Sequence, residues 1–140
     1  MKAYADTSVL LPLFVPDALS AKADALLNLS ETFLIVSDFT VAEFMSALSR
    51  KVRMREVSAA SAGRLAANFD AWLSGLPERV TLQPEDVATA TAYLRRFDLT
   101  LRTPDALHVA LAHRHRATLA TLDVRLAADA GRLGISTLVS

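Results

Sequence analysis

Four acidic residues of this sequence stand where a carboxylate could do more than face solvent. Asp6 follows the stretch KAYA and Asp123 follows LATL, so each comes at the carboxyl end of a predicted strand. Glu43 lies among apolar residues in FTVAEFMSAL, and Asp105 lies in the first turn of the helix predicted for PDALHVALA. If the fold brings these side chains together, burial and like charge raise their pKa values, and protons or a cation must neutralise them.

The available donor atoms limit which cation could do so. The chain has no cysteine, and its histidines do not form an obvious metal-binding pair, so the ligands would be carboxylate oxygens. Oxygen ligands of this kind favour Mg²⁺ or Mn²⁺. These ions can activate water and stabilise a leaving oxygen in phosphodiester cleavage, either singly or as a pair about 3.5–4 Å apart.

Each acid also has a simpler interpretation. Asp6 and Asp123 could cap the helices that follow them, and Asp105 is favoured at a helix start by the helix dipole, by about 0.3–1 kcal/mol. Thr40 and Glu43 have the spacing of a capping box, which needs no metal. Residue types and spacing alone therefore leave two hypotheses open, a set of helix ends or one acidic metal site.

Short apolar runs and longer amphipathic segments alternate along the chain. The predicted strands are residues 2–6, 33–37, 79–82, 117–121 and 135–139. Helices are predicted from Pro16 through 29, from Thr40 through the RKVR segment, over 58–74 and 84–97, from the capping residue Thr103 onward, and over 123–130. The apolar stretch SVLLPLF is predicted to be broken at Pro12.

This alternation predicts an α/β fold in one domain over residues 1–140. We expect a short central parallel sheet of four to five strands, flanked by helices on both faces. In such sheets, functional sites gather beyond the carboxyl ends of the strands, near the point where the strand order reverses. The four acids all fall on strand ends or early helical turns, so we expect them at this one edge.

The composition excludes several classes of protein. Lys plus Arg and Asp plus Glu each number 15, so net charge gives no sign of a polyanionic partner, although a local basic patch could still exist. The absence of cysteine excludes a disulfide scaffold. No uncharged apolar run reaches the roughly 18 residues of a membrane span, and Asp6 interrupts the only candidate export signal. The sequence predicts a cytoplasmic protein that does not associate with a membrane.

Four segments in order carry a resemblance to a known family. AYADTSVLLPLF, SDFTVAEFMSAL, LRTPDALHVALA and LATLDVRL are together similar to the PIN-domain ribonucleases, and most closely to the VapC-type toxins of type II toxin–antitoxin pairs. The resemblance covers nearly the whole chain. It implies a PIN-like nuclease domain in which Asp6, Glu43, Asp105 and Asp123 bind Mg²⁺ or Mn²⁺ and carry catalysis.

The resemblance also implies further roles. Thr7 and Thr121 match small hydroxyl positions that help to orient water or an acid, Thr121 with the catalytic acids and Thr7 near the substrate. The implied activity is cleavage of RNA by activated water, leaving a 5′-phosphate and a 3′-hydroxyl. The implied partners are a second copy of the chain, as a homodimer, and a VapB-type antitoxin that blocks the site.

Several other charged residues lie close in sequence to the four acids or on the same predicted helices. Arg102, just before the Asp105 helix, is a candidate for contacting substrate. Residues 50–55 hold a basic cluster that either compensates a helix end or follows RNA phosphates. His108, His113 and His115 are interpreted as packing or surface residues, and Asp86 as a solvated acid. No aromatic-rich basic surface stands out, so base stacking is not predicted.

Three alternatives remain open from the sequence. The same fold and metal could serve RNA processing outside a toxin pair, or could act on DNA. A non-catalytic α/β binding module would use the acids only as helix caps. A phosphoacceptor domain is disfavoured, because it would need a lysine late in the chain and none follows Lys51.

Overall fold

The computed structural model describes residues 1–28 and 32–138. Its elements in chain order are β1 (Lys2–Ala5), α1 (Thr7–Phe14), α2 (Ser20–Leu27), β2 (Phe33–Ser37), α3 (Asp38–Arg53), α4 (Ala59–Ser74), β3 (Glu78–Val80), α5 (Pro84–Leu94), α6 (Thr103–Arg114), β4 (Thr118–Ala120), α7 (Val124–Arg132) and β5 (Thr137–Leu138).

The strands form one parallel sheet. Within the described residues it has five strands in the order β3-β2-β1-β4-β5, which confirms the predicted α/β class. The first strand is central: Ala3 pairs with Leu34 on β2 and with Thr118 on β4. The chain therefore turns outward on both sides of β1, and the crevice between the carboxyl ends of β1 and β4 is where a doubly wound sheet places its site.

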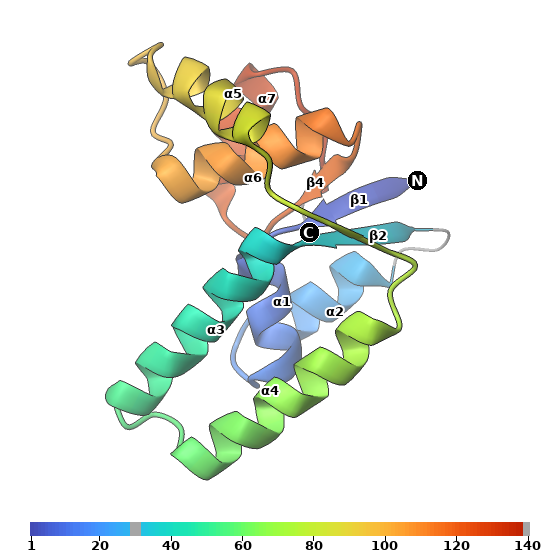
Figure 1. The fold of residues 1–140 in the computed structure, drawn as a ribbon, viewed down its shortest axis with the longest axis vertical. Coiled ribbons are helices and arrows are strands. Elements are labelled where there is room, and N and C mark those ends of the chain that lie inside the picture. The colour runs from blue at the N-terminus through green and yellow to red at the C-terminus, as the bar shows by residue number, and fades with distance from the viewer. Residues whose placement is uncertain (29–31, 139–140) are drawn as a thin grey trace.

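Helices cover both faces of the sheet (Figure 1). Tyr4, Ile35 and Leu119 project from the strands into one core with α5, α6 and α7. Their neighbours Ala5 and Val36 project to the opposite side, into a core with α1, α3 and α4. Because successive side chains of a strand point to opposite faces, a sheet covered on both sides needs consecutive apolar residues, which β1, β2 and β4 have in AYA, FLIV and LA.

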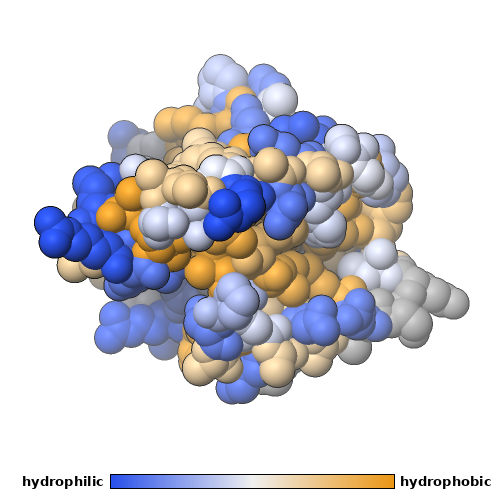
Figure 2. All heavy atoms as spheres, turned by 90° about the horizontal axis from the view of Figure 1, so that it is seen from below, coloured by the Kyte–Doolittle hydropathy of each residue, from blue (hydrophilic) through white to orange (hydrophobic). Residues whose placement is uncertain are grey.

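The layer of α1 to α4 leaves apolar surface exposed. Phe14 packs edge-on against Phe44 and Trp72, and Phe44 stacks on Phe69 with ring centroids 3.8 Å apart. Around this aromatic cluster the apolar side chains are only half buried, Leu11, Met45 and Leu65 among them. Figure 2, which views the molecule from the end where α3 and α4 meet, shows apolar atoms gathered in the middle of this face.

Two helix boundaries near the amino terminus differ from the prediction. Helix α1 runs through Pro12 instead of breaking there, because proline removes only one intrahelical hydrogen bond while Val9 and Leu10 are fully buried. Helix α2 begins at Ser20 and not at Pro16, because the residues before it form a turn. The Ser20 hydroxyl accepts from the backbone N–H of Asp17 at 2.9 Å, and the Asp17 carboxylate accepts from that of Leu19 at 2.7 Å. Leu29, predicted at its end, lies outside the described residues.

Four further boundaries also differ from the prediction. Helix α3 is capped by Ser37, which accepts from the backbone N–H of Thr40 at 3.0 Å, so the predicted Thr40–Glu43 capping box does not form. Helix α6 has Arg102, and not Thr103, at its cap position. Helix α5 ends at Leu94, since Phe97 has a φ of 62° and cannot continue a helix. The last strand covers only Thr137–Leu138 of the predicted 135–139, and residue 139 lies outside the described part.

The interpretation of Asp86 as a solvated acid was wrong. Its side chain is 1% exposed and accepts two hydrogen bonds from the Arg114 guanidinium, at 2.7 and 2.9 Å. This pair joins α5 to the end of α6, the helix that carries Asp105. No helix within the described residues is long and apolar enough to cross a membrane.

Candidate active site

A pocket of about 380 Å³ opens beyond the carboxyl ends of the strands. Three of the four acids singled out in the sequence, Glu43, Asp105 and Asp123, line it together with Arg102. They come from α3, from the start of α6 and from the turn between β4 and α7. The fourth acid, Asp6, is not among the lining residues. A larger hollow of about 650 Å³ lies at the opposite end of α6, near Arg116, and none of these four acids lines it.

Asp6 is buried where β1 passes into α1. One of its carboxylate oxygens, Oδ1, accepts from the Ser8 hydroxyl at 2.6 Å and from the backbone N–H of Val9 at 3.4 Å. The other, Oδ2, accepts from the Thr121 hydroxyl at 2.6 Å. Burial raises the pKa of Asp6 above its ordinary value, and His108 and these hydrogen bonds only partly oppose the rise. A nearby cation would therefore favour the ionised form.

Two hydroxyl groups connect Asp6 to the turn that carries Asp123. The Thr121 hydroxyl accepts from the backbone N–H of Asp123 at 3.0 Å, and the Ser8 hydroxyl accepts from the backbone N–H of Leu122 at 2.9 Å. Asp123 caps α7 by accepting from the backbone N–H groups of residues 125 and 126 with Oδ1 alone. Asp123 is thus both a helix cap and a lining residue of the pocket.

Glu43 is held by two neighbours through a single oxygen. Its Oε1 accepts from the Thr7 hydroxyl at 2.9 Å and hydrogen-bonds to His108 Nε2. Burial tends to raise the pKa of Glu43, but the hydrogen bond and charge of His108, with the bond from Thr7, lower it below its ordinary value. Glu43 is therefore ionised at neutral pH.

His108 is the residue that sequence reasoning placed least well. It is buried, as a packing residue would be, but its two ring nitrogens bridge Glu43 and the Tyr4 hydroxyl, the latter at 2.7 Å. The Tyr4 hydroxyl in turn bonds the Ser37 hydroxyl at 2.7 Å. The signal was present in the sequence: His108 stands three residues after Asp105, on the same face of the helix.

Asp105 and two arginines complete the pocket. Asp105 Oδ2 accepts from the backbone N–H of Arg102 at 3.1 Å, which secures the first turn of α6. The side chain of Arg102 is exposed and lines the pocket, as does that of Arg125 on α7, which the sequence analysis did not single out. Neither guanidinium is ion-paired with any residue that the structure describes.

Glu43, Asp105 and Asp123 each keep one carboxylate oxygen free of partners among the described residues, whereas both oxygens of Asp129, which also lines the pocket, have partners in Thr100 and Arg132. Among the described residues nothing hydrogen-bonds Glu43 Oε2, Asp105 Oδ1 or Asp123 Oδ2, because their other oxygens make all the contacts given above. In the observed conformation, however, no three Asp, Glu, His or Cys side chains of the described residues lie close enough to hold one ion. A shared cation would require these side chains to rotate inward.

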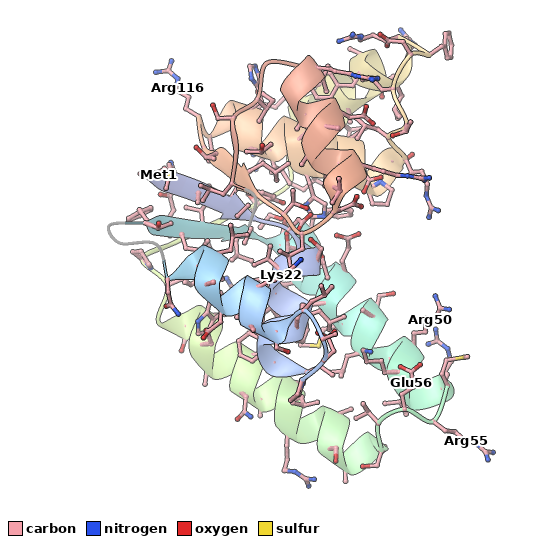
Figure 3. The ribbon with its side chains drawn as sticks, turned by 180° about the vertical axis from the view of Figure 1, so that it is seen from behind. Met1, Lys22, Arg50, Arg55, Glu56 and Arg116 are labelled. Carbon is pink, nitrogen blue, oxygen red and sulfur yellow. The ribbon has the colours of Figure 1, made fainter. Side chains whose placement is uncertain are left out.

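The basic cluster of residues 50–55 lies elsewhere. Figure 3 shows Arg50, Arg55 and Glu56 at the far tip where α3 meets α4. Lys51 pairs with Glu56 at 3.4 Å, and Arg53 donates to the Ser49 hydroxyl at 2.9 Å. Arg50 follows Glu43 by two helical turns, or about 10 Å along α3. Whether RNA reaches this tip stays a hypothesis.

Comparison with known proteins gives one family. The model of the PIN domain matches residues 3–131. Similar solved structures include Mycobacterium tuberculosis VapC20, described as a sarcin-ricin loop cleaving toxin, with 20% identity, a TM-score of 0.71, and coverage of 90% of this chain and 93% of that one. A comparison with curated proteins finds no match.

Two solved complexes show the same fold. A toxin–antitoxin complex from Klebsiella pneumoniae has 22% identity, a TM-score of 0.69, and coverage of 96% of each chain. VapBC2 from Rickettsia felis, bound to a DNA fragment from its promoter, has 16% identity, a TM-score of 0.67, and coverage of 100% of this chain and 98% of that one.

Proposed function

The chain belongs to the PIN domain family, and on this premise we propose that it is a Mg²⁺- or Mn²⁺-dependent endoribonuclease that acts as the toxin of a type II toxin–antitoxin pair. The observation that carries the proposal is the pocket at the carboxyl ends of β1 and β4. Glu43, Asp105 and Asp123 each line it with one oxygen that no described residue hydrogen-bonds.

The donor chemistry of the pocket fits a hard divalent cation. The ligands offered are carboxylate oxygens, which Mg²⁺ and Mn²⁺ prefer. Asp105 and Asp123 would hold the ion directly through their free oxygens, and Glu43 would complete its shell through a water. Asp6 would join them because each carboxylate oxygen has two lone pairs, so an oxygen that accepts a hydroxyl bond can also face a cation. When bound, the ion would supply positive charge that activates water and neutralises charge developing on the phosphate.

The protein residues then have distinct tasks. Thr121 and Ser8 fix the Asp6 carboxylate with short hydrogen bonds, and Thr121 also positions the backbone of Asp123. Thr7 and His108 fix Glu43 in its ionised form, so Glu43 Oε2 can accept a proton from an attacking water. Arg102 is placed at the rim to bind a phosphate of the substrate.

RNA as substrate and an antitoxin as partner are part of the proposal. Both are supported by the descriptions of proteins that share the fold, a sarcin-ricin loop cleaving toxin and a toxin–antitoxin complex. The half-buried apolar surface around Phe14 and Trp72 would suit a VapB-type antitoxin or a second copy in a homodimer. The activity would take place in the cytoplasm, where such RNA substrates are found.

Cleavage of a mixed RNA pool by the purified protein tests the proposal. Activity should require Mn²⁺ or Mg²⁺ and should disappear with EDTA. It should also disappear in Asp105→Asn, because asparagine keeps an oxygen to accept from Arg102 but loses the charge. Asp70→Asn, at an exposed acid on α4, is the matched control and should stay active. Cleavage of RNA that survives Asp105→Asn would refute the catalytic assignment, and cleavage of DNA alone would favour the DNA alternative.

A further inference from the structure

The connection between α5 and α6 presents an aromatic ring to solvent. Phe97 is 91% exposed, the largest exposed fraction given for any large apolar side chain in the described residues. Its backbone is left-handed, with a φ of 62°. A bulky residue rarely adopts this conformation, which costs on the order of 1 kcal/mol that glycine or asparagine would avoid. The stability of the fold therefore does not explain why a phenylalanine stands at this position.

The loop around Phe97 is nonetheless firmly braced. The Asp98 carboxylate accepts two hydrogen bonds from the Arg96 guanidinium, at 2.9 and 3.1 Å. The backbone N–H and the hydroxyl of Thr100 both donate to Asp129 on α7, at 2.9 and 2.6 Å. The ring is thus presented by a fixed support, which lowers the entropy cost of binding through it.

This support is continuous with the candidate active site. Thr100 and Asp129, which anchor the loop, both line the acidic pocket, as does Arg102. Three residues of chain span at most about 10 Å, so the Phe97 backbone lies within that distance of the Thr100 backbone. In Figure 1 the connection between α5 and α6 projects from the edge of the molecule and returns to the start of α6.

The charge beside the ring favours a polyanion over a protein or lipid partner. Arg95 is exposed and has no ion-pair or hydrogen-bond partner for its side chain among the described residues. Arg102 and Arg125 at the pocket rim likewise form no ion pair with any residue that the structure describes. An exposed aromatic face next to free cations is the arrangement with which proteins hold unpaired bases, the ring stacking on the base and the cations contacting phosphates.

We propose that Phe97 stacks on an unpaired base of the RNA whose backbone enters the acidic pocket, with Arg95 contacting a neighbouring phosphate. The inference rests on the proposed ribonuclease function and makes it more specific. The substrate is then RNA with an accessible, unpaired base close to the cleaved bond. A fully paired duplex cannot offer a base to the ring, so selectivity for loops or single strands follows from this residue.

The test measures binding separately from cleavage. Affinity for fluorescein-labelled single-stranded RNA of mixed sequence is measured in Mg²⁺ with Asp105→Asn, which keeps the RNA intact, and with the double variant Asp105→Asn/Phe97→Asn. Stacking on one base is worth roughly fivefold to a hundredfold in affinity, and the double variant should lose this factor. Phe97→Tyr should retain it. Val87→Ala, at an exposed apolar residue near the start of α5, is the control and should change nothing.

Further readouts separate stacking from a structural role. Phe97→Asn should melt at the same or a higher temperature, because asparagine tolerates the left-handed backbone. Affinity for a fully paired RNA duplex should not change. Arg95→Gln should reduce the salt dependence of single-strand binding by about one phosphate contact, a slope change of about 0.7.

Three outcomes would overturn the inference in distinguishable ways. If the wild-type protein cleaves RNA but Phe97→Asn binds single strands within twofold of its parent, the stacking role is wrong and the nuclease stands. Loss of antitoxin binding in that variant, with unchanged RNA affinity, would assign the loop to a protein partner instead. If the wild-type protein neither binds nor cleaves RNA with metal present, the proposed function itself fails.

Discussion

Removing the Arg114 guanidinium should destabilise the protein strongly without touching the acidic pocket. In Arg114→Met, the Asp86 carboxylate loses both hydrogen bonds from the guanidinium and keeps, among the described residues, only the bond from the backbone N–H of Gln83, at 2.8 Å. The carboxylate is 1% exposed, so water cannot replace what is lost. The carbonyl of Thr81, which accepts from Arg114 at 2.9 Å, loses its partner as well.

The size of the effect follows from burial. Breaking one side of a buried, hydrogen-bonded ion pair costs about 3–5 kcal/mol. The Arg114 side chain is 27% exposed, so we expect the lower end, about 3 kcal/mol. In a chain of this length that lowers the Tm by roughly 10 °C. Arg114→Lys should lower the free energy of unfolding by less, because lysine keeps the positive charge but cannot donate the two parallel hydrogen bonds.

Thermal and urea unfolding, followed by circular dichroism, measure this loss. The double variant Asp86→Leu/Arg114→Met should recover most of it, because no buried charge is left without a partner. Below its Tm, Arg114→Met should still cleave RNA. The reasoning would be refuted if Arg114→Met melted within 2 °C of the wild type (about 0.5 kcal/mol), or if the double variant were no more stable than the single one.

Three further predictions concern the acids. Asp6→Asn should abolish cleavage yet raise the metal-free Tm by a few degrees, about 1 kcal/mol. The folded-state pKa of Asp6 lies above its ordinary 3.8. Its contribution to the free energy of unfolding is therefore present in acid and is lost as pH rises through the folded pKa. Urea unfolding at a series of pH values should show this loss in the wild type and not in Asp6→Asn. Mg²⁺ at ten times its Kd should add about 1.4 kcal/mol, or about 5 °C in Tm, by calorimetry, and no shift would argue against a convergent acid site. His108→Gln should raise the pKa of Glu43, so the fall of the cleavage rate in acid should begin at a higher pH. If the pH profile of the rate did not move, Glu43 would not be the group that accepts the proton.

The order of elements and the class of fold could be predicted from periodicity, because each strand and helix needs one or two apolar faces. The ends of the helices could not be predicted as well. Thr40 is a good capping residue by type, but its hydroxyl lies in the buried group around Tyr4 and Ser37, so the cap passes to Ser37. The competing contact comes from β1, more than thirty residues away in sequence.

The candidate site could be predicted in part for the same reason. Strand ends and helix starts share one edge of a doubly wound sheet, which placed Glu43, Asp105 and Asp123 together. The partners of these acids depend on tertiary packing. Glu43 meets His108 across 65 residues, and Asp86 meets Arg114 across 28, and no local pattern marks either pair. The exposure of Phe97 likewise appears only once the end of α5 is known.

The central place of β1 has a consequence for the timing of synthesis. Strand β1 can pair with β4 only after β4 has been synthesised, since Asp6 and the Thr121 hydroxyl that bonds it are 115 residues apart. Closing a contact over so long a stretch is among the later events of folding. A chain still emerging from the ribosome holds Asp6 and Glu43 but lacks the segment from Thr121 to Asp123. The pocket, and whatever chemistry it performs, can therefore be assembled only after nearly all of the chain described here has been translated.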